Sequence, residues 1–81
     1  MRISVLLFAS LADIVGTREI NINAPGFTDV NSVFDKLAKD FPSLETYRST
    51  VLFALNSEFA HPASPVKDGD EIAFFPPVSG G

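Results

Sequence analysis

The order of apolar and polar positions along the chain predicts five strands and one main helix. A continuous apolar run at residues 3–8 predicts a central strand that is covered on both faces. Residues 17–23 alternate between apolar and polar side chains, which is typical of a half-exposed strand paired with the first as a hairpin. Three further strands are predicted at residues 51–55, 58–60 and 71–75.

The main helix is predicted between the second and third strands. Thr28 or Asp29 can cap its first turn by accepting hydrogen bonds from free backbone amides, and Pro42 ends it. Residues 11–15 predict a short helical turn that Gly16 closes, and residues 44–49 predict a loop or a short turn of helix. The apolar stripe of the main helix recurs at steps of three and four, at Val30, Val33, Phe34, Leu37 and Phe41.

This order of elements, β-β-α-β-β-β, predicts an α+β fold. We expect the last strand to lie beside the first in a mixed sheet of about five strands, with the main helix packed on one face. The order matches the β-grasp, or ubiquitin-like, plan. Residues 1–75 are predicted to form this domain and residues 76–81 a flexible C-terminal Gly-Gly tail.

One helix can shield only one face of such a sheet. Side chains alternate along a strand, so Phe8 and Phe75 are predicted to point away from the helix, and Phe59 adds a third ring in a short peripheral strand. Exposed together, these rings would form a partner-binding patch close to the start of the tail. In the alternative, short loops and residues 44–47 cover them.

Composition narrows the class of protein. The chain has 81 residues, 46% of them hydrophobic, and a formal net charge of -4 without a basic cluster, so we expect one small globular domain and no nucleic-acid partner. Its longest apolar run, residues 5–9, is too short to span a bilayer. The first residues enter a strand directly, without the features of a signal peptide, so we expect no membrane partner and a cytoplasmic protein.

The side chains offer little catalytic chemistry. There is no cysteine, which excludes disulfides, thiolate metal sites and a persulfide on this chain. The single histidine, His61, has no second histidine beside it and fits a surface loop better than a metal site. We therefore predict no metal and no bound cofactor, and the chain is poorly equipped as a free-standing enzyme.

The sequence ends on Gly80 and Gly81. Glycine lacks a Cβ, so a tail of this kind can thread a narrow channel, and we expect the carboxylate of Gly81 to be the reactive group. Pro76 and Pro77 before it favour an extended, stiff path. A chance pair of small residues at a chain end is the alternative.

Residues 68–81 closely resemble the end of the small sulfur-carrier subunits of molybdopterin synthase. Carriers of the thiamine pathway share the fold and the two glycines but typically lack the Phe-Phe-Pro-Pro segment that precedes them here. The chain departs from the pattern at Ala12, since an arginine is common in this turn. The similarity extends to Leu7-Phe8-Ala9, Val15-Gly16-Thr17, the helix after Thr28, and Ala54-Leu55-Asn56.

The resemblance implies a carrier that is not catalytic alone. An E1-like adenylating enzyme would join the Gly81 carboxylate to AMP, and sulfur from a separate persulfide donor would convert the glycyl adenylate to a thiocarboxylate. This group would enter the large catalytic subunit and donate sulfur to a cyclic pyranopterin phosphate, two carriers serving each dithiolene within a heterotetramer. Gly80 would form a slim neck, and Pro76, Pro77, Val78 and Ser79 the rest of the tail.

Three other functions remain open from the sequence. The chain could carry sulfur for thiamine or tRNA thiolation, or it could be a ubiquitin-like modifier that Gly81 joins to target lysines. Both begin with the same activation of the tail. A plain interaction domain with an incidental tail is the last alternative, and it predicts that deletion of Gly81 changes nothing.

Overall fold

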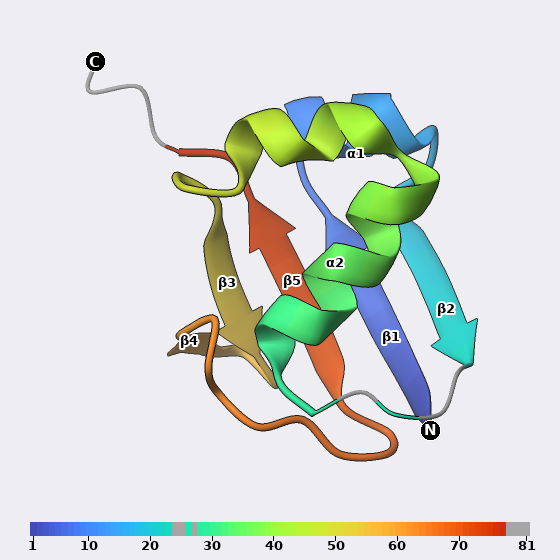
Figure 1. Ribbon diagram of the computed structural model, residues 1–81, viewed down its shortest axis with the longest axis vertical. Coiled ribbons are helices and arrows are strands. Elements are labelled where there is room, and N and C mark those ends of the chain that lie inside the picture. Colours follow the sequence, from blue (N-terminus) through green and yellow to red (C-terminus); the bar gives the residue numbers. More distant parts are fainter. Residues whose placement is uncertain (24–25, 27, 78–81) are drawn as a thin grey trace.

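The computed structural model describes residues 1–23, 26 and 28–77. Strands in this part of the chain form one five-stranded sheet in the order β2-β1-β5-β3-β4 (Figure 1). In this described sheet, β1 and β5 pair in parallel, and the other neighbouring strands are antiparallel. The elements are β1 (Arg2–Leu7), α1 (Ser10–Val15), β2 (Glu19–Asn23), α2 (Val30–Asp40), the 3-10 helix η1 (Pro42–Tyr47), β3 (Leu52–Leu55), β4 (Glu58–Ala60) and β5 (Glu71–Phe75).

The helices lie on one side of this sheet, with α2 running across it (Figure 1). The predicted mixed sheet with one main helix on one face is therefore confirmed. Ile3, Val5 and Leu7 of β1 point toward the helices and are fully buried. The prediction that both faces of the first strand are covered is wrong, because Ser4 and Leu6 on its other face are only half-buried.

Three aromatic rings form the centre of the core. Phe34 of α2 lies edge-to-face with Phe53 of β3 and with Phe74 of β5, at centroid distances of 6.2 and 5.6 Å. Phe53 and Phe74 are also edge-to-face with each other, 5.3 Å apart. Rings at these distances and angles attract one another beyond the effect of simple burial. They fasten α2 to β3 and to β5, the strand that leads to the tail.

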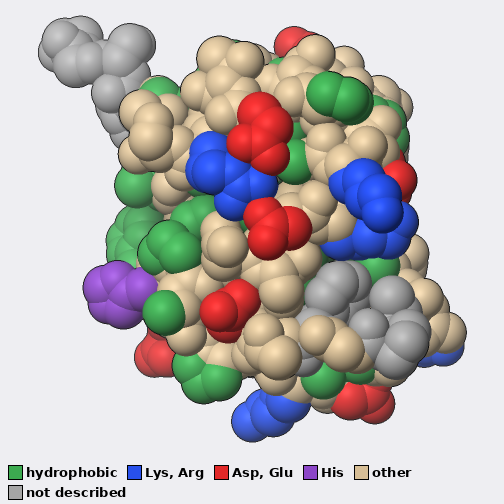
Figure 2. Space-filling model, viewed as in Figure 1, with side chains coloured by type: hydrophobic (Ala, Val, Ile, Leu, Met, Phe, Trp, Pro, Cys, Tyr) green, Lys and Arg blue, Asp and Glu red, His purple; other side chains and the backbone are tan. Residues whose placement is uncertain are grey.

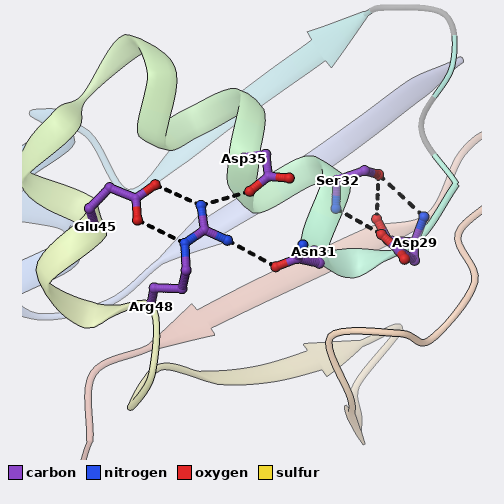
Figure 3. Close-up of polar contacts among 6 residues, drawn as sticks. All are labelled: Asp29, Asn31, Ser32, Asp35, Glu45 and Arg48. Carbon is purple, nitrogen blue, oxygen red and sulfur yellow. Dashed lines mark hydrogen bonds and ion pairs between the residues drawn. The ribbon is translucent and has the colours of Figure 1, made fainter.

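A capping box starts α2. The Asp29 carboxylate accepts a hydrogen bond from the Ser32 backbone amide at 2.8 Å, and the Ser32 hydroxyl accepts one from the Asp29 amide at 3.2 Å (Figure 3). The backbone amides of Asp29 and Ser32 thereby gain side-chain acceptors at the start of the helix. Of the two predicted caps, Asp29 is the one used. Phe41 caps the other end and is half-buried against the core, directly before Pro42.

Arg48 joins η1 to α2 (Figure 3). Its guanidinium donates to both carboxylate oxygens of Glu45 at 2.8 and 2.7 Å, donates to the Asn31 side-chain oxygen at 3.0 Å, and pairs with Asp35 at 2.6 Å. It also lies 4.9 Å from the centre of the Phe34 ring. These bonds raise the pKa of Arg48 and lower that of Glu45. The segment predicted as a loop or short helical turn is thus a fastened 3-10 helix.

A second polar cluster holds the start of β5. The buried Asp70 carboxylate accepts hydrogen bonds from the Asn56 side-chain amide at 3.0 Å and from the Lys67 backbone amide at 2.8 Å. Asn56 in turn accepts from the Glu71 backbone amide at 2.9 Å. Gly69, in the turn directly before β5, has a φ of 90°, which glycine adopts without strain. The β3–β4 turn and the first residue of β5 are therefore locked together.

Phe74→Ala should lower the free energy of unfolding by about 3–5 kcal/mol, because it removes the ring at the centre of the core. The matched control, Phe59→Ala, removes an 85% exposed ring and should change stability by less than about 0.5 kcal/mol. Urea denaturation checks both, and Phe74→Leu provides a milder change if the alanine variant does not fold. Equal effects at the two positions would contradict the packing described here.

Stability should also depend on pH through Glu45. Its pKa lies below the ordinary value of 4.5 in the folded protein because of the hydrogen bonds from Arg48, so its stabilising contribution is present above 4.5 and is lost as the pH falls through the folded pKa. Wild type should therefore exceed Glu45→Gln in urea midpoint at neutral pH, and the difference should vanish in acid. In an Arg48→Gln background, Glu45→Gln should have no such effect; a difference that persisted there would exclude this pair as its cause.

Candidate docking surface and tail

The face of the sheet opposite the helices carries a stacked pair of aromatic rings. Phe8 directly follows β1, and Phe75 is the last residue of β5. Because these strands are parallel neighbours, their ends meet at one edge of the sheet. The ring centroids are 4.6 Å apart and the planes are inclined by 14°. Phe8 nevertheless remains 42% exposed.

Phe59 lies on the same open face as this pair, but on β4, which is separated from β5 by β3. It projects from β4 opposite Ala54 of β3 and is 85% exposed. We refer to Phe8, Phe59 and Phe75 as the aromatic face. The predicted exposure of its rings is confirmed for Phe8 and Phe59, while Phe75 is half-buried. Residues 44–47 do not cover the rings, since Leu44 is buried in the core beneath the helices.

Two shallow hollows border the aromatic face, and all three rings line both of them. The first hollow has a volume of about 280 Å³, and the second about 360 Å³. The remaining lining of the first hollow is Leu6, Ala54, Ser57, Glu71 and Ala73. That of the second is Ala9, Leu52 and Pro76.

Sequence reasoning missed Leu52 as part of this surface. Leu52 is 42% exposed and lies opposite Phe75 in the register of β3 and β5. The alternation that placed Phe8 and Phe75 applies equally to the third strand, where the neighbour Phe53 is buried. That alternation places Leu52 beside the aromatic face.

The tail begins at this surface. Pro76 is half-buried and lines the second hollow, and Pro77 is exposed. The sequence-predicted roles of Val78, Ser79, Gly80 and Gly81 concern positions outside the described residues, so they stay predictions. What the structure places is the base of the tail, which leaves the sheet directly beside the stacked rings.

Other candidate residues lie apart from this surface. His61 is exposed in the connection after β4, and Ala12 is half-buried in α1. Within residues 1–23, 26 and 28–77, no three His, Cys, Asp or Glu side chains gather as a metal site would require. None of the helices in that same part of the chain has the length and apolar character that a bilayer crossing needs. Figure 2 shows acidic and basic side chains interspersed over the helix-covered face.

The fold and its open aromatic face define a ubiquitin-like β-grasp protein. Comparison with solved structures agrees: SAMP1 of Haloferax volcanii, a small archaeal modifier protein, superimposes with a TM-score of 0.84 at 32% identity, covering all of both chains. A protein-protein complex of subunits 1 and 2 of molybdopterin-converting factor from Helicobacter pylori contains a chain that matches with a TM-score of 0.67 at 26% identity, again over both full lengths.

Sequence comparison is more specific. A family model described as the ThiS family matches residues 5–81, and the chain therefore belongs to the ThiS family. It is 38% identical over 81 residues to the molybdopterin synthase sulfur carrier subunit of Arabidopsis thaliana, which covers all of this chain and 84% of the relative.

Proposed function

We propose that this chain is the sulfur-carrier subunit of a molybdopterin synthase, with the carboxyl group of Gly81 as the carrier. The observation that carries the proposal is the stacked pair of Phe8 and Phe75 at the base of the tail. An apolar docking surface and the tail it would deliver are thereby one continuous feature. The similarity to named sulfur-carrier subunits supports the same function.

The chemistry follows from the weakness of a carboxylate as an electrophile. An E1-like enzyme activates it: a carboxylate oxygen of Gly81 attacks the α-phosphorus of ATP, pyrophosphate leaves, and a glycyl adenylate results. A sulfide equivalent then attacks the carbonyl carbon, and AMP leaves with the bonding electron pair. The product is a thiocarboxylate, whose sulfur is a far better nucleophile than the original oxygen.

The large catalytic subunit supplies the remaining chemistry. The acidic chain has a formal net charge of -4, which makes it a poor host for a phosphorylated pterin. General acid–base groups and phosphate binding therefore belong to the larger protein, and this chain acts as a cytoplasmic donor without activity of its own. The complex of subunits 1 and 2 from Helicobacter pylori supports a partnership of this kind.

A second candidate is a ubiquitin-like modifier. The similarity to SAMP1, at 32% identity over the full length, is the observation that favours it. Both functions use the same activated Gly81, and they differ in the final step. In the modifier, a lysine amine attacks the glycyl carbonyl and receives the glycyl group, whereas in the carrier the thiocarboxylate sulfur itself attacks the pterin precursor. The acceptor therefore separates the two.

Incubation with an E1-like enzyme, ATP and sulfide should raise the mass of the chain by the replacement of one oxygen with sulfur, located at Gly81 by fragmentation. A variant that lacks Gly81 should show no gain. The sulfur-bearing chain, mixed with the large synthase subunit and the cyclic pyranopterin phosphate, should yield the dithiolene product. Lysine conjugates in place of product would establish the modifier, and unchanged behaviour of the deletion variant would exclude both.

Phe75→Asp should weaken binding to the large subunit about 100-fold, because it places a charge in the apolar centre of the docking surface. Phe59→Asp tests the same surface at an 85% exposed position if the first variant is unstable. Ser43→Asp, an exposed position in η1, is the control with the same change in charge. Calorimetry measures the affinities, and an effect of Ser43→Asp as large as that of Phe75→Asp would contradict a docking role for the open face.

A further inference from the structure

The first hollow has a floor of small residues within a ring of larger ones. Ala54 and Ala73 lie directly opposite each other on β3 and β5. The same row of the sheet continues to Leu6 on one side and to Phe59 on the other. Since two alanines replace the bulk found at their neighbours, the row sinks in the middle and leaves the depression of about 280 Å³.

The two ends of this hollow differ in chemistry. Along β5, Glu71, Ala73 and Phe75 follow one another on the open face, and same-face neighbours on a strand are separated by about 6.5–7 Å. One end is therefore apolar, where Phe75 stacks on Phe8. The other end carries a carboxylate, about 13 Å away along the backbone.

Hydrogen bonds hold the backbone of Glu71, while its carboxylate points to solvent-accessible surface. Its backbone amide donates to the Asn56 side chain at 2.9 Å, and its carbonyl accepts from the Asn56 amide at 2.8 Å. The side chain is exposed. Among the ion pairs and side-chain hydrogen bonds of the described residues, none uses the Glu71 carboxylate. An exposed carboxylate on a firmly held strand, at the end of a mainly apolar hollow, is suited to an outside cation.

We propose that the hollow receives one arginine side chain from the partner protein. Its aliphatic stem lies over Ala54 and Ala73 beside the Phe59 ring, and its guanidinium pairs with Glu71. Arginine fits such a site because its stem is apolar and its head is charged. The planar guanidinium bonds a carboxylate through two parallel N–H groups, which the point charge of lysine cannot do, and it is also attracted to aromatic faces.

This arginine site is part of the docking surface described above. The identity of the partner, the large synthase subunit, rests on the proposed function. A second copy of this chain is a poorer occupant of the hollow. Each copy has a formal net charge of -4, and the hollow itself ends in a carboxylate, so two copies repel where a basic partner is attracted.

Glu71→Gln should weaken binding to the large subunit about tenfold at low salt, because a charge-assisted hydrogen-bonded pair is lost. Its effect should shrink at high salt, where exposed charges are screened. Glu58→Gln is the matched control: it removes an exposed carboxylate of β4 that does not line the hollow. Affinities of all three proteins at two salt concentrations, with thermal unfolding to confirm the fold, test the proposal; equal affinities of the two variants would overturn it.

Ala54→Leu fills the floor of the hollow without touching Glu71, and it should also weaken binding at least tenfold. Full affinity of this variant would show that nothing enters the hollow.

A titration independent of the synthase separates the inference from the proposed function. N-acetylarginine methylamide should shift the amide resonances of Glu71 and Ala73 in wild type more than its neutral citrulline counterpart does. Glu71→Gln should abolish that difference. Identical responses to the two compounds would overturn the arginine site, whatever the large subunit does. Failure of wild type to bind the large subunit, with the arginine response intact, would instead overturn the proposed partner.

Discussion

The parallel pairing of β1 with β5 is the constraint on which the rest of the structure depends. Parallel neighbours end at the same edge of a sheet, so the residues that follow Leu7 and Phe74 in the register, Phe8 and Phe75, come together as a stacked pair. An antiparallel pairing would separate these rings by the length of the strands. Parallel strands also require a long crossover, and here that crossover contains α2, which covers the core. One pairing thus sets the core, the aromatic face and the base of the tail.

A single helical layer gives adjacent residues opposite environments. Phe74 is 1% exposed at the centre of the core, whereas Phe75 is half-buried on the open face. Phe59, at 85% exposure, gains little from folding, so stability alone does not explain a ring at that position. Contiguous apolar surface favours association with other proteins, while a net charge of -4 opposes association between copies of the chain. The surface is therefore suited to a different partner.

Much of this arrangement was predictable from local pattern, because alternation and the helical period report which side of an element is apolar. Residues 71–75 became β5 with the predicted bounds, and Asp29 capped α2. Local pattern failed to predict the surroundings of a residue where these depend on other elements of the fold. The apolar run of the first strand does not reveal that only one layer covers the sheet, which leaves Leu6 half-buried. Nor can it show that Ala54 and Ala73 meet across two strands to form a hollow.

Two separated contacts, at the aromatic face and at Glu71, would fix the orientation of a small carrier and thereby direct its tail. Six residues lie between Phe75 and the end of Gly81, and six extended residues span at most about 20–22 Å. Docking through the aromatic face alone would leave the domain free to rotate about that apolar contact, and a small rotation at Phe75 would become a large displacement at Gly81. A second contact at Glu71, about 13 Å along the same strand, removes that freedom. The apolar rings would then supply most of the affinity, and the charged end of the hollow would set the direction.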